Sequence, residues 1–157
     1  MKLINAITTL ALLFLSPLVA LGAAPVVVSN VTGTVSISEY QGDITKSVLV
    51  SWTSDASGDA NSVISPFVGE MLRVSFDPGT ASPTASYDIV LNDSDSVDVL
   101  GGAGANLSAT VTSSQAVTID GPGTDDHLPC AVTGKLTLVV SNAGNAKTGT
   151  MRLYWRR

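Results

Sequence analysis

The sequence predicts an all-β protein: a single antiparallel β-sandwich, preceded by a hydrophobic N-terminal segment. Residues 25–157 are rich in Val, Thr and Ser, and their apolar and polar side chains alternate as in half-buried strands. Turn-forming residues separate these runs about every ten residues. No window keeps the 3.6-residue period of an amphipathic helix. Regularly spaced short strands are typical of sandwiches and barrels, and this pattern fits jelly-roll and Ig-like topologies equally well.

The first two predicted strands show the alternation most clearly. Residues 34–38 alternate polar and apolar side chains without exception. In residues 47–52, the side chains of Val48, Val50 and Trp52 fall on one face. This face is predicted to be buried, and Trp52 is therefore predicted to be a core residue.

A third strand is predicted over residues 70–76, after a polar loop at residues 54–59. Leu72, Val74 and Phe76 share one face of this strand. The strand is expected to end at the Asp-Pro-Gly that follows, because Pro-Gly pairs form turns.

Five more strands complete the predicted sandwich. They cover residues 87–91, 97–100, 110–119, 132–140 and 148–155. Tyr154 and Trp155 point to opposite faces of the last strand, so at most one of them belongs to the core.

The loops and the domain organisation follow from this strand pattern. The longest predicted loops after residue 100 are residues 103–108 and 120–129. No internal repeat or linker divides residues 25–157, so we predict one domain there.

Residues 1–24 have the layout of a secretory signal peptide: a basic start, an apolar middle and a small-residue exit. Cleavage after Gly22 or after Ala23 fits equally well. The apolar run of this leader is short for a membrane span, and Pro17 interrupts it. No membrane span is predicted in the mature chain either. The alternative is a retained hydrophobic arm that packs on a partner subunit.

The composition excludes several functional classes. The 157 residues carry a formal net charge of −5, and Lys and Arg are scattered along the sequence without a stripe, which argues against nucleic-acid binding. A single Cys excludes an internal disulfide and a multi-cysteine zinc site, and a single His excludes a histidine-rich metal site. Charged residues make up only 13% of the chain, about half the usual share for a soluble domain.

Three acids, Asp93, Asp95 and Asp98, are weak candidates for a calcium site. Calcium prefers several oxygen ligands on a tight loop, but the EF-hand pattern is absent. The simpler interpretation is a solvated turn whose Asp and Ser side chains bond to their own backbone.

No catalytic set is predicted. Asp125, Asp126 and His127 precede Cys130, but neither a nucleophile elbow nor a cysteine–histidine signature accompanies them. We expect a polar loop there, and we expect Cys130 to be a small buried side chain. An intermolecular disulfide through Cys130 stays open as an alternative in an oxidising compartment.

The remaining candidates for binding are aromatic and basic side chains. Five aromatic residues are candidates for a sugar-stacking platform: Tyr40, Trp52, Tyr87, Tyr154 and Trp155. Aromatics make up only 5% of the chain, which argues against an exposed cluster. Arg152, Arg156 and Arg157 form a small basic cap, interpreted as a solvated end or a subunit contact.

Several segments spread over the predicted sandwich carry a family resemblance. They are residues 51–59, 72–74, 77–84, 87–89, 97–106, 136–138 and 141–150, in an order that spans roughly residues 33–155. The chain resembles, in these segments, small structural proteins of tailed bacteriophages, which are virion accessory or decoration proteins. The resemblance brings no set of enzymatic residues with it.

The leading interpretation is therefore a non-enzymatic virion structural protein that acts as a homo-oligomer, without a cofactor and in contact with other virion proteins. The leader departs from this family, because a protein assembled on a cytoplasmic capsid needs no secretion signal. The alternative is a secreted or periplasmic domain that binds a glycan or protein ligand at a cell surface.

Overall fold

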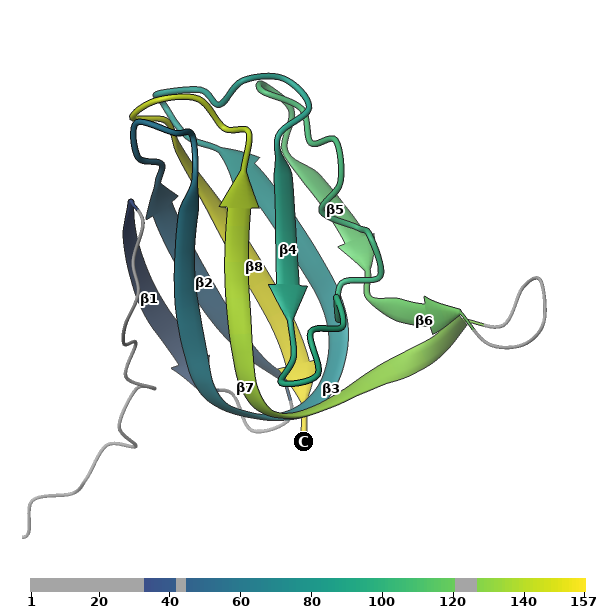
Figure 1. The fold of residues 1–157 in the computed structure, drawn as a ribbon. Coiled ribbons are helices and arrows are strands. Elements are labelled where there is room, and N and C mark those ends of the chain that lie inside the picture. Colours follow the sequence, from purple (N-terminus) through teal and green to yellow (C-terminus); the bar gives the residue numbers. More distant parts are fainter. Residues whose placement is uncertain (1–32, 42–44, 121–126) are drawn as a thin grey trace, which may run out of the picture.

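The computed structural model describes residues 33–41, 45–120 and 127–157, and every regular element in these ranges is a β-strand (Figure 1). The described strands are β1 (Thr34–Gln41), β2 (Thr45–Thr53), β3 (Ala60–Pro78), β4 (Asp88–Asn92), β5 (Ser113–Ala116), β6 (Thr118–Asp120), β7 (His127–Ser141) and β8 (Thr148–Arg156). The described ranges contain no helix, so the predicted all-β fold class is confirmed. The leader, residues 1–24, lies outside these ranges, and its signal-peptide interpretation stays a prediction.

All strand pairs belong to antiparallel ladders, and the main sheet has the order β1-β2-β8-β3-β7-β4. The short strands β5 and β6 pair with β3 and β7, respectively. The sheet folds over on itself and is nearly closed into a barrel. Two layers result, with β3-β7-β4 in one and β1-β2-β8-β3 in the other.

The long strand β3 belongs to both layers. Its first part pairs with β7 as far as Met71, and its second part pairs with β8 from Glu70 onward. Figure 1 shows this strand running down one layer, turning at the bottom and rising in the other layer. Gly69 lies at the turn, where a Cβ would come within 2.5 Å of the carbonyl oxygen of Arg156. Only glycine allows the two backbones to approach this closely.

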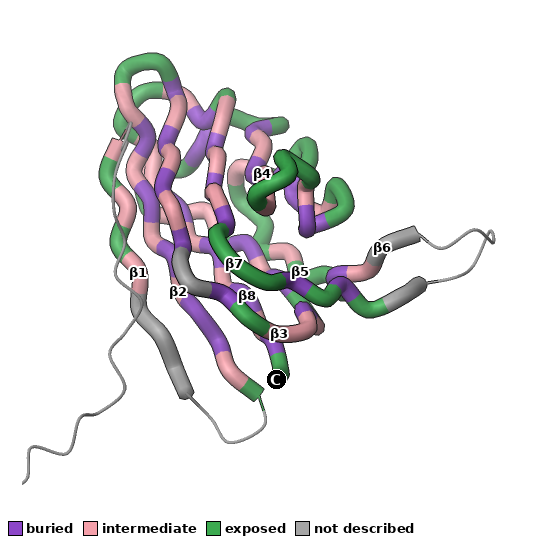
Figure 2. The backbone as a smooth tube through the Cα atoms, turned by 60° about the horizontal axis from the view of Figure 1, so that its bottom comes forward, coloured by how far each residue is buried: buried purple, intermediate pink, exposed green. Residues whose placement is uncertain are grey.

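The core lies between the two layers. Buried residues alternate with more exposed ones along the strands (Figure 2). Val48, Val50 and Trp52 are all at most 2% exposed, which confirms the buried face predicted for β2. Trp155 is buried as well, whereas Tyr154 lies on the opposite face and is half-buried. Two tilted aromatic pairs contribute to this core: Trp52 with Tyr87 and Phe67 with Trp155.

The predicted face of the third strand is wrong at one position. Val74 and Phe76 are buried, but Leu72 is only half-buried and Met71 takes its place in the core. The reason is a register shift between Met71 and Arg73, which changes the alternation of side chains between the faces.

The predicted strand boundaries needed three corrections. Residues 60–69, predicted as no element, form the first half of β3. Residues 97–100 form turns, with a single bridge between Asn92 and Asp98, because Val99 and Leu100 enter the core from a loop. The predicted strand over residues 110–119 divides into β5 and β6 around the buried Val117.

The loop predicted over residues 120–129 is shorter than expected. β6 and the start of β7 pair from Thr118↔Pro129 to Asp120↔His127, which leaves only residues 121–126 outside the described strands. These paired ends extend away from the body of the molecule (Figures 1 and 2).

Candidate functional site

The outer face of the β1-β2-β8 layer carries two rows of hydroxyl groups. Strand register aligns Thr34, Thr53 and Thr148 in one row. It aligns Ser36, Ser51 and Thr150 in the other. Neighbouring strands are about 4.8 Å apart, and positions two residues apart along a strand are separated by roughly 7 Å. The six hydroxyls therefore form a small regular grid.

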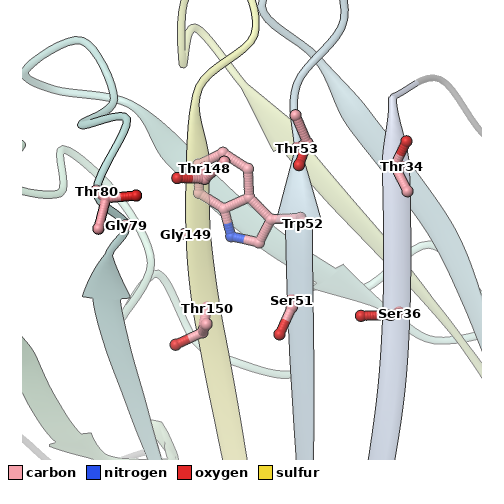
Figure 3. A pocket seen from close by; sticks show the side chains of 10 residues that line it. All are labelled: Thr34, Ser36, Ser51, Trp52, Thr53, Gly79, Thr80, Thr148, Gly149 and Thr150. Atoms are coloured by element: carbon pink, nitrogen blue, oxygen red, sulfur yellow. The ribbon is translucent and has the colours of Figure 1, made fainter.

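This hydroxyl grid surrounds a depression with a volume of about 360 Å³ (Figure 3). Gly79 and Thr80 complete the wall on the β3 side, and no charged side chain lines it. Only Thr148 among the six grid residues has a side-chain hydrogen bond within the described chain, accepted from the Ala81 N–H at 3.2 Å. The depression thus offers uncharged hydroxyls that are available to a ligand.

Residue 149 of β8, which lines the depression, is a glycine and has no side chain. A Cβ at Gly149 would collide with the ring of Trp52, which packs directly against this backbone. The Trp52 side chain is buried, and its indole Nε1 has no hydrogen-bond partner among the described residues. The close packing of Trp52 on Gly149 fixes the strand that carries Thr148 and Thr150.

Basic side chains occupy the other end of the same face. The guanidinium of Arg73 on β3 stacks over the ring of Tyr154 on β8, with its Cζ 4.1 Å from the ring centroid. Arg152, also on β8, pairs with Ser75 of β3. These positions alternate with the buried Leu153 and Trp155, so they share the outer face.

Arg156 forms an ion pair with Glu70 at this end of the face. Its Nε and Nη2 atoms donate to the two carboxylate oxygens at 2.7 and 3.1 Å. The hydrogen bond from Arg156 lowers the pKa of Glu70, and the same contact raises the pKa of Arg156. The pair links the end of β8 to the bend of β3.

The two outer strands of the main sheet, β4 and β1, differ in whether a loop covers their free edge. The edge of β4 is covered by residues 98–107, through the hydrogen bonds Ile89 N–H to Gly104 O at 2.8 Å, Val99 N–H to Leu91 O at 2.9 Å and Leu107 N–H to Tyr87 O at 2.8 Å. β1 pairs only with β2 in the described chain, and no loop hydrogen bond there covers its second edge. Among the described residues, the second edge of β1 is therefore open.

The three acids proposed as calcium candidates lie in one turn after β4. Asp93 Oδ1 accepts hydrogen bonds from the N–H groups of Asp95 and Val97, both at 2.9 Å. The Asp98 carboxylate accepts from Leu91, Leu100 and Gly102 at 3.2, 3.1 and 2.9 Å. In the described part of the chain, no group of three or more His, Cys, Asp or Glu residues is arranged to hold a metal ion. Calcium binding here stays a prediction.

The structure describes only some of the residues around the Asp-His segment that the sequence analysis considered for catalysis. Asp125 and Asp126 lie outside the described residues, and His127 is described only as the first residue of β7. Cys130 is buried and free, as expected. Its burial and the charges of Asp93 and Asp98 raise the pKa of its thiol. The described chain also has no helix long and apolar enough to cross a membrane.

Sequence reasoning missed that Arg73 stacks on Tyr154 and lies on the same outer face as Arg152. These residues are about 80 positions apart, and only the pairing of β3 with β8 brings them together. The alternation of each strand predicts a face for each side chain, but it does not predict which strands are neighbours.

Comparison with known proteins gives a distant structural similarity. No family model matches the chain, and no curated protein matches it. A solved structure, that of the infectious bursal disease virus Gx strain, is 18% identical and is similar over 84% of this chain and 32% of that chain, with a TM-score of 0.25. This chain thus spans about a third of the length of that one. The similarity is too distant to identify a function, and the resemblance to phage structural proteins stays a prediction.

Proposed function

We propose that the protein is a non-enzymatic structural subunit of a virion, a decoration or accessory protein that works by self-association. The resemblance of its sequence to tailed-phage structural proteins supports this function. The structural observation that carries it is the edge of β1 that is open among the described residues.

An open strand edge is a template for pairing with another chain. Proteins that stay monomeric blunt such edges with charged side chains (above all lysine), proline, bulges or a covering loop, and β1 has one charged residue, Glu39. The β4 edge has a covering loop, whereas β1 contains neither lysine nor proline and pairs with β2 without a register shift. Val35 and Ile37 of β1 pack against the core but are only half-buried. A neighbouring subunit at this edge would cover both side chains.

The neutral hydroxyl grid beside β1 also fits a subunit contact. Charged residues are depleted at the centres of protein interfaces. The grid has no charged side chain, and charged residues make up only 13% of the chain. Covering an uncharged face costs less hydration energy than covering a charged one, provided that the partner forms hydrogen bonds to its hydroxyls.

Light scattering across a concentration series tests the proposal, with the full chain and with the chain that lacks residues 1–24. We expect concentration-dependent oligomers, or co-sedimentation with virions. Ser36→Lys places a charge on the open edge and should weaken the association. Thr133→Lys adds the same charge on β7, which has partners, and should have no effect. A chain that stays monomeric at high concentration and does not bind virions would contradict the proposed function.

The depression favours a second candidate, a surface domain that binds a neutral glycan. Its volume lies within the range of ligand pockets, about 300–1,000 Å³, and its lining offers hydroxyl donors and acceptors without charge. Titration calorimetry with neutral oligosaccharides tests this candidate. Thr150→Val should abolish any binding, and Thr133→Val is the matched control. Binding that Thr150→Val leaves intact would exclude the depression as the site.

A further inference from the structure

The geometry points to a head-to-tail contact between two copies: the arginine patch of one copy, defined as Arg73, Arg152, Tyr154, Arg156 and Arg157, docks on the acidic surface of a second copy at its turn after β4. The inference rests on the proposed function, because it names a contact through which self-association would occur.

The fold gathers all four arginines of the chain into this patch. Arg152 and Arg156 lie on the outer face of β8, and Arg157 follows directly. β3 pairs with β8 so that Arg73 lies opposite Tyr154. The patch therefore combines two strands that are far apart in sequence, and it concentrates positive charge in a chain whose net charge is −5.

Two guanidinium groups in the arginine patch are available for a partner. Arg156 is already paired with Glu70. Within the described chain, neither Arg73 nor Arg152 donates a side-chain hydrogen bond or forms an ion pair. Stacking on Tyr154 holds the Arg73 guanidinium in one place and leaves its N–H groups free to donate. Guanidinium groups bind carboxylates through two parallel hydrogen bonds, and Arg and Tyr are enriched at the energetic centres of interfaces.

A second copy offers the matching charge. Outside the patch the chain is even more acidic than its net charge of −5, and it therefore presents carboxylates to any neighbour. Asp95 is exposed in the turn after β4 and has no side-chain hydrogen bond within the described chain, while Asp93 uses only its Oδ1 atom there. The charges of the two surfaces are complementary.

The contact must join two molecules, because the two surfaces lie apart within one. β3 and β7 separate β8 from β4 in the sheet order, and β4 lies in the opposite layer (Figure 1). A contact between different surfaces of identical copies builds rings when the rotation closes and filaments when it does not.

Analytical ultracentrifugation of the full chain tests the inference by charge reversal. Arg73→Glu with Arg152→Glu should weaken self-association about tenfold or more, because the contact depends on opposite charges. Asp93→Arg with Asp95→Arg should weaken it to a similar extent. Mixing the two double variants in equal amounts should restore association, since each surface of one then meets an opposite charge on the other.

Controls separate this contact from general charge effects. Lys135→Glu with Lys147→Glu changes the net charge by as much as the arginine reversal, and it should leave association unchanged. Circular dichroism should show that every variant is folded. Added salt should weaken wild-type association, because the Debye length falls from about 10 Å at 0.1 M to about 3 Å at 1 M.

Each remaining outcome is decisive. If the wild type associates and the charge reversals do not matter, or the mixture stays monomeric, the docking contact is wrong while self-association stands. If the arginine reversal impairs only the binding of virions or of an anionic polymer, the patch serves another partner and the second-copy contact is wrong. A wild type that neither associates nor binds virions overturns both this contact and the proposed function.

Discussion

At the scale of single residues, Tyr87 gives the clearest dependence of stability on pH. Its side chain is 1% exposed, and burial together with the charge of Asp77 raises its pKa to about 12 from 10. The neutral phenol therefore stabilises the fold fully below pH 10, and this contribution is lost as the pH rises from 10 towards 12.

Replacing Tyr87 should therefore change how the free energy of unfolding falls with rising pH above pH 10. We expect Tyr87→Phe to unfold at a higher pH than the wild type, since phenylalanine has no proton to lose. Near pH 7 its free energy of unfolding should be within about 1.5 kcal/mol of the wild type, as for other shape-conserving core changes. Fluorescence-monitored unfolding between pH 7 and pH 12 measures the alkaline midpoint and the free energy of unfolding. Equal alkaline midpoints would show that ionisation of Tyr87 does not limit stability.

The buried Cys130 gives a second prediction at this scale. Its thiol is 5% exposed and its pKa is raised, so little of the reactive thiolate exists at neutral pH. We expect a thiol reagent to label it only after unfolding, and we expect no dimer linked through Cys130 in the folded protein. Labelling followed by mass spectrometry, with and without denaturant, measures this. Fast labelling of the native protein would mean that the strand around Cys130 opens readily.

At the scale of elements, the cover of the β4 edge depends on Asp98. Its carboxylate accepts three backbone N–H groups, from β4 itself and from the loop that covers it. Hydrogen bonds to charged groups each contribute about 1.5–3 kcal/mol. Asp98→Ala should therefore lower the free energy of unfolding by about 2–4 kcal/mol, since such contributions are not fully additive.

Asp95→Ala is the matched control for Asp98→Ala, because Asp95 lies in the same turn and is exposed. Surface changes of this kind alter stability by less than about 0.5 kcal/mol. Urea denaturation measures both variants. If the two lose the same stability, the carboxylate of Asp98 does not hold the loop in place.

The elements also show what sequence alone can predict. Alternation predicted most strands, placed Trp52 in the core and put Tyr154 and Trp155 on opposite faces, because burial of one face imposes a period of two. It missed residues 60–69, because this segment contains a register shift between Ile64 and Phe67 and a bend at Gly69, which interrupt a simple period of two. It missed the arginine patch for another reason: strand order is a property of the whole sheet.

At the scale of the whole molecule, β8 holds the fold together. It lies between β2 and β3, pairing with β2 from Thr45↔Arg156 to Thr53↔Thr148. Its side chains Met151, Leu153 and Trp155 are all at most 4% exposed. Without β8, no strand pairing among the described residues would join β1 and β2 to the rest of the sheet.

A chain that stops after residue 147 should therefore not fold. We expect it to lack the cooperative thermal transition of the full chain and to bind a hydrophobic dye, because the core between the layers stays exposed. Removing Arg157 alone should leave the transition in place, since that residue follows the last pair of the ladder. A cooperative transition in the shorter chain would mean that β3, β7 and β4 form an independent unit.

The central place of β8 has a consequence for biosynthesis. A ribosome makes β1, β2 and β3 long before the segment that must be inserted between them. Until that segment emerges, β2 lacks the strand that joins it to β3, and the nearly closed sheet cannot form. The sheet order thus makes the joining of the two layers through β8 one of the last events of synthesis, after every other strand has been made.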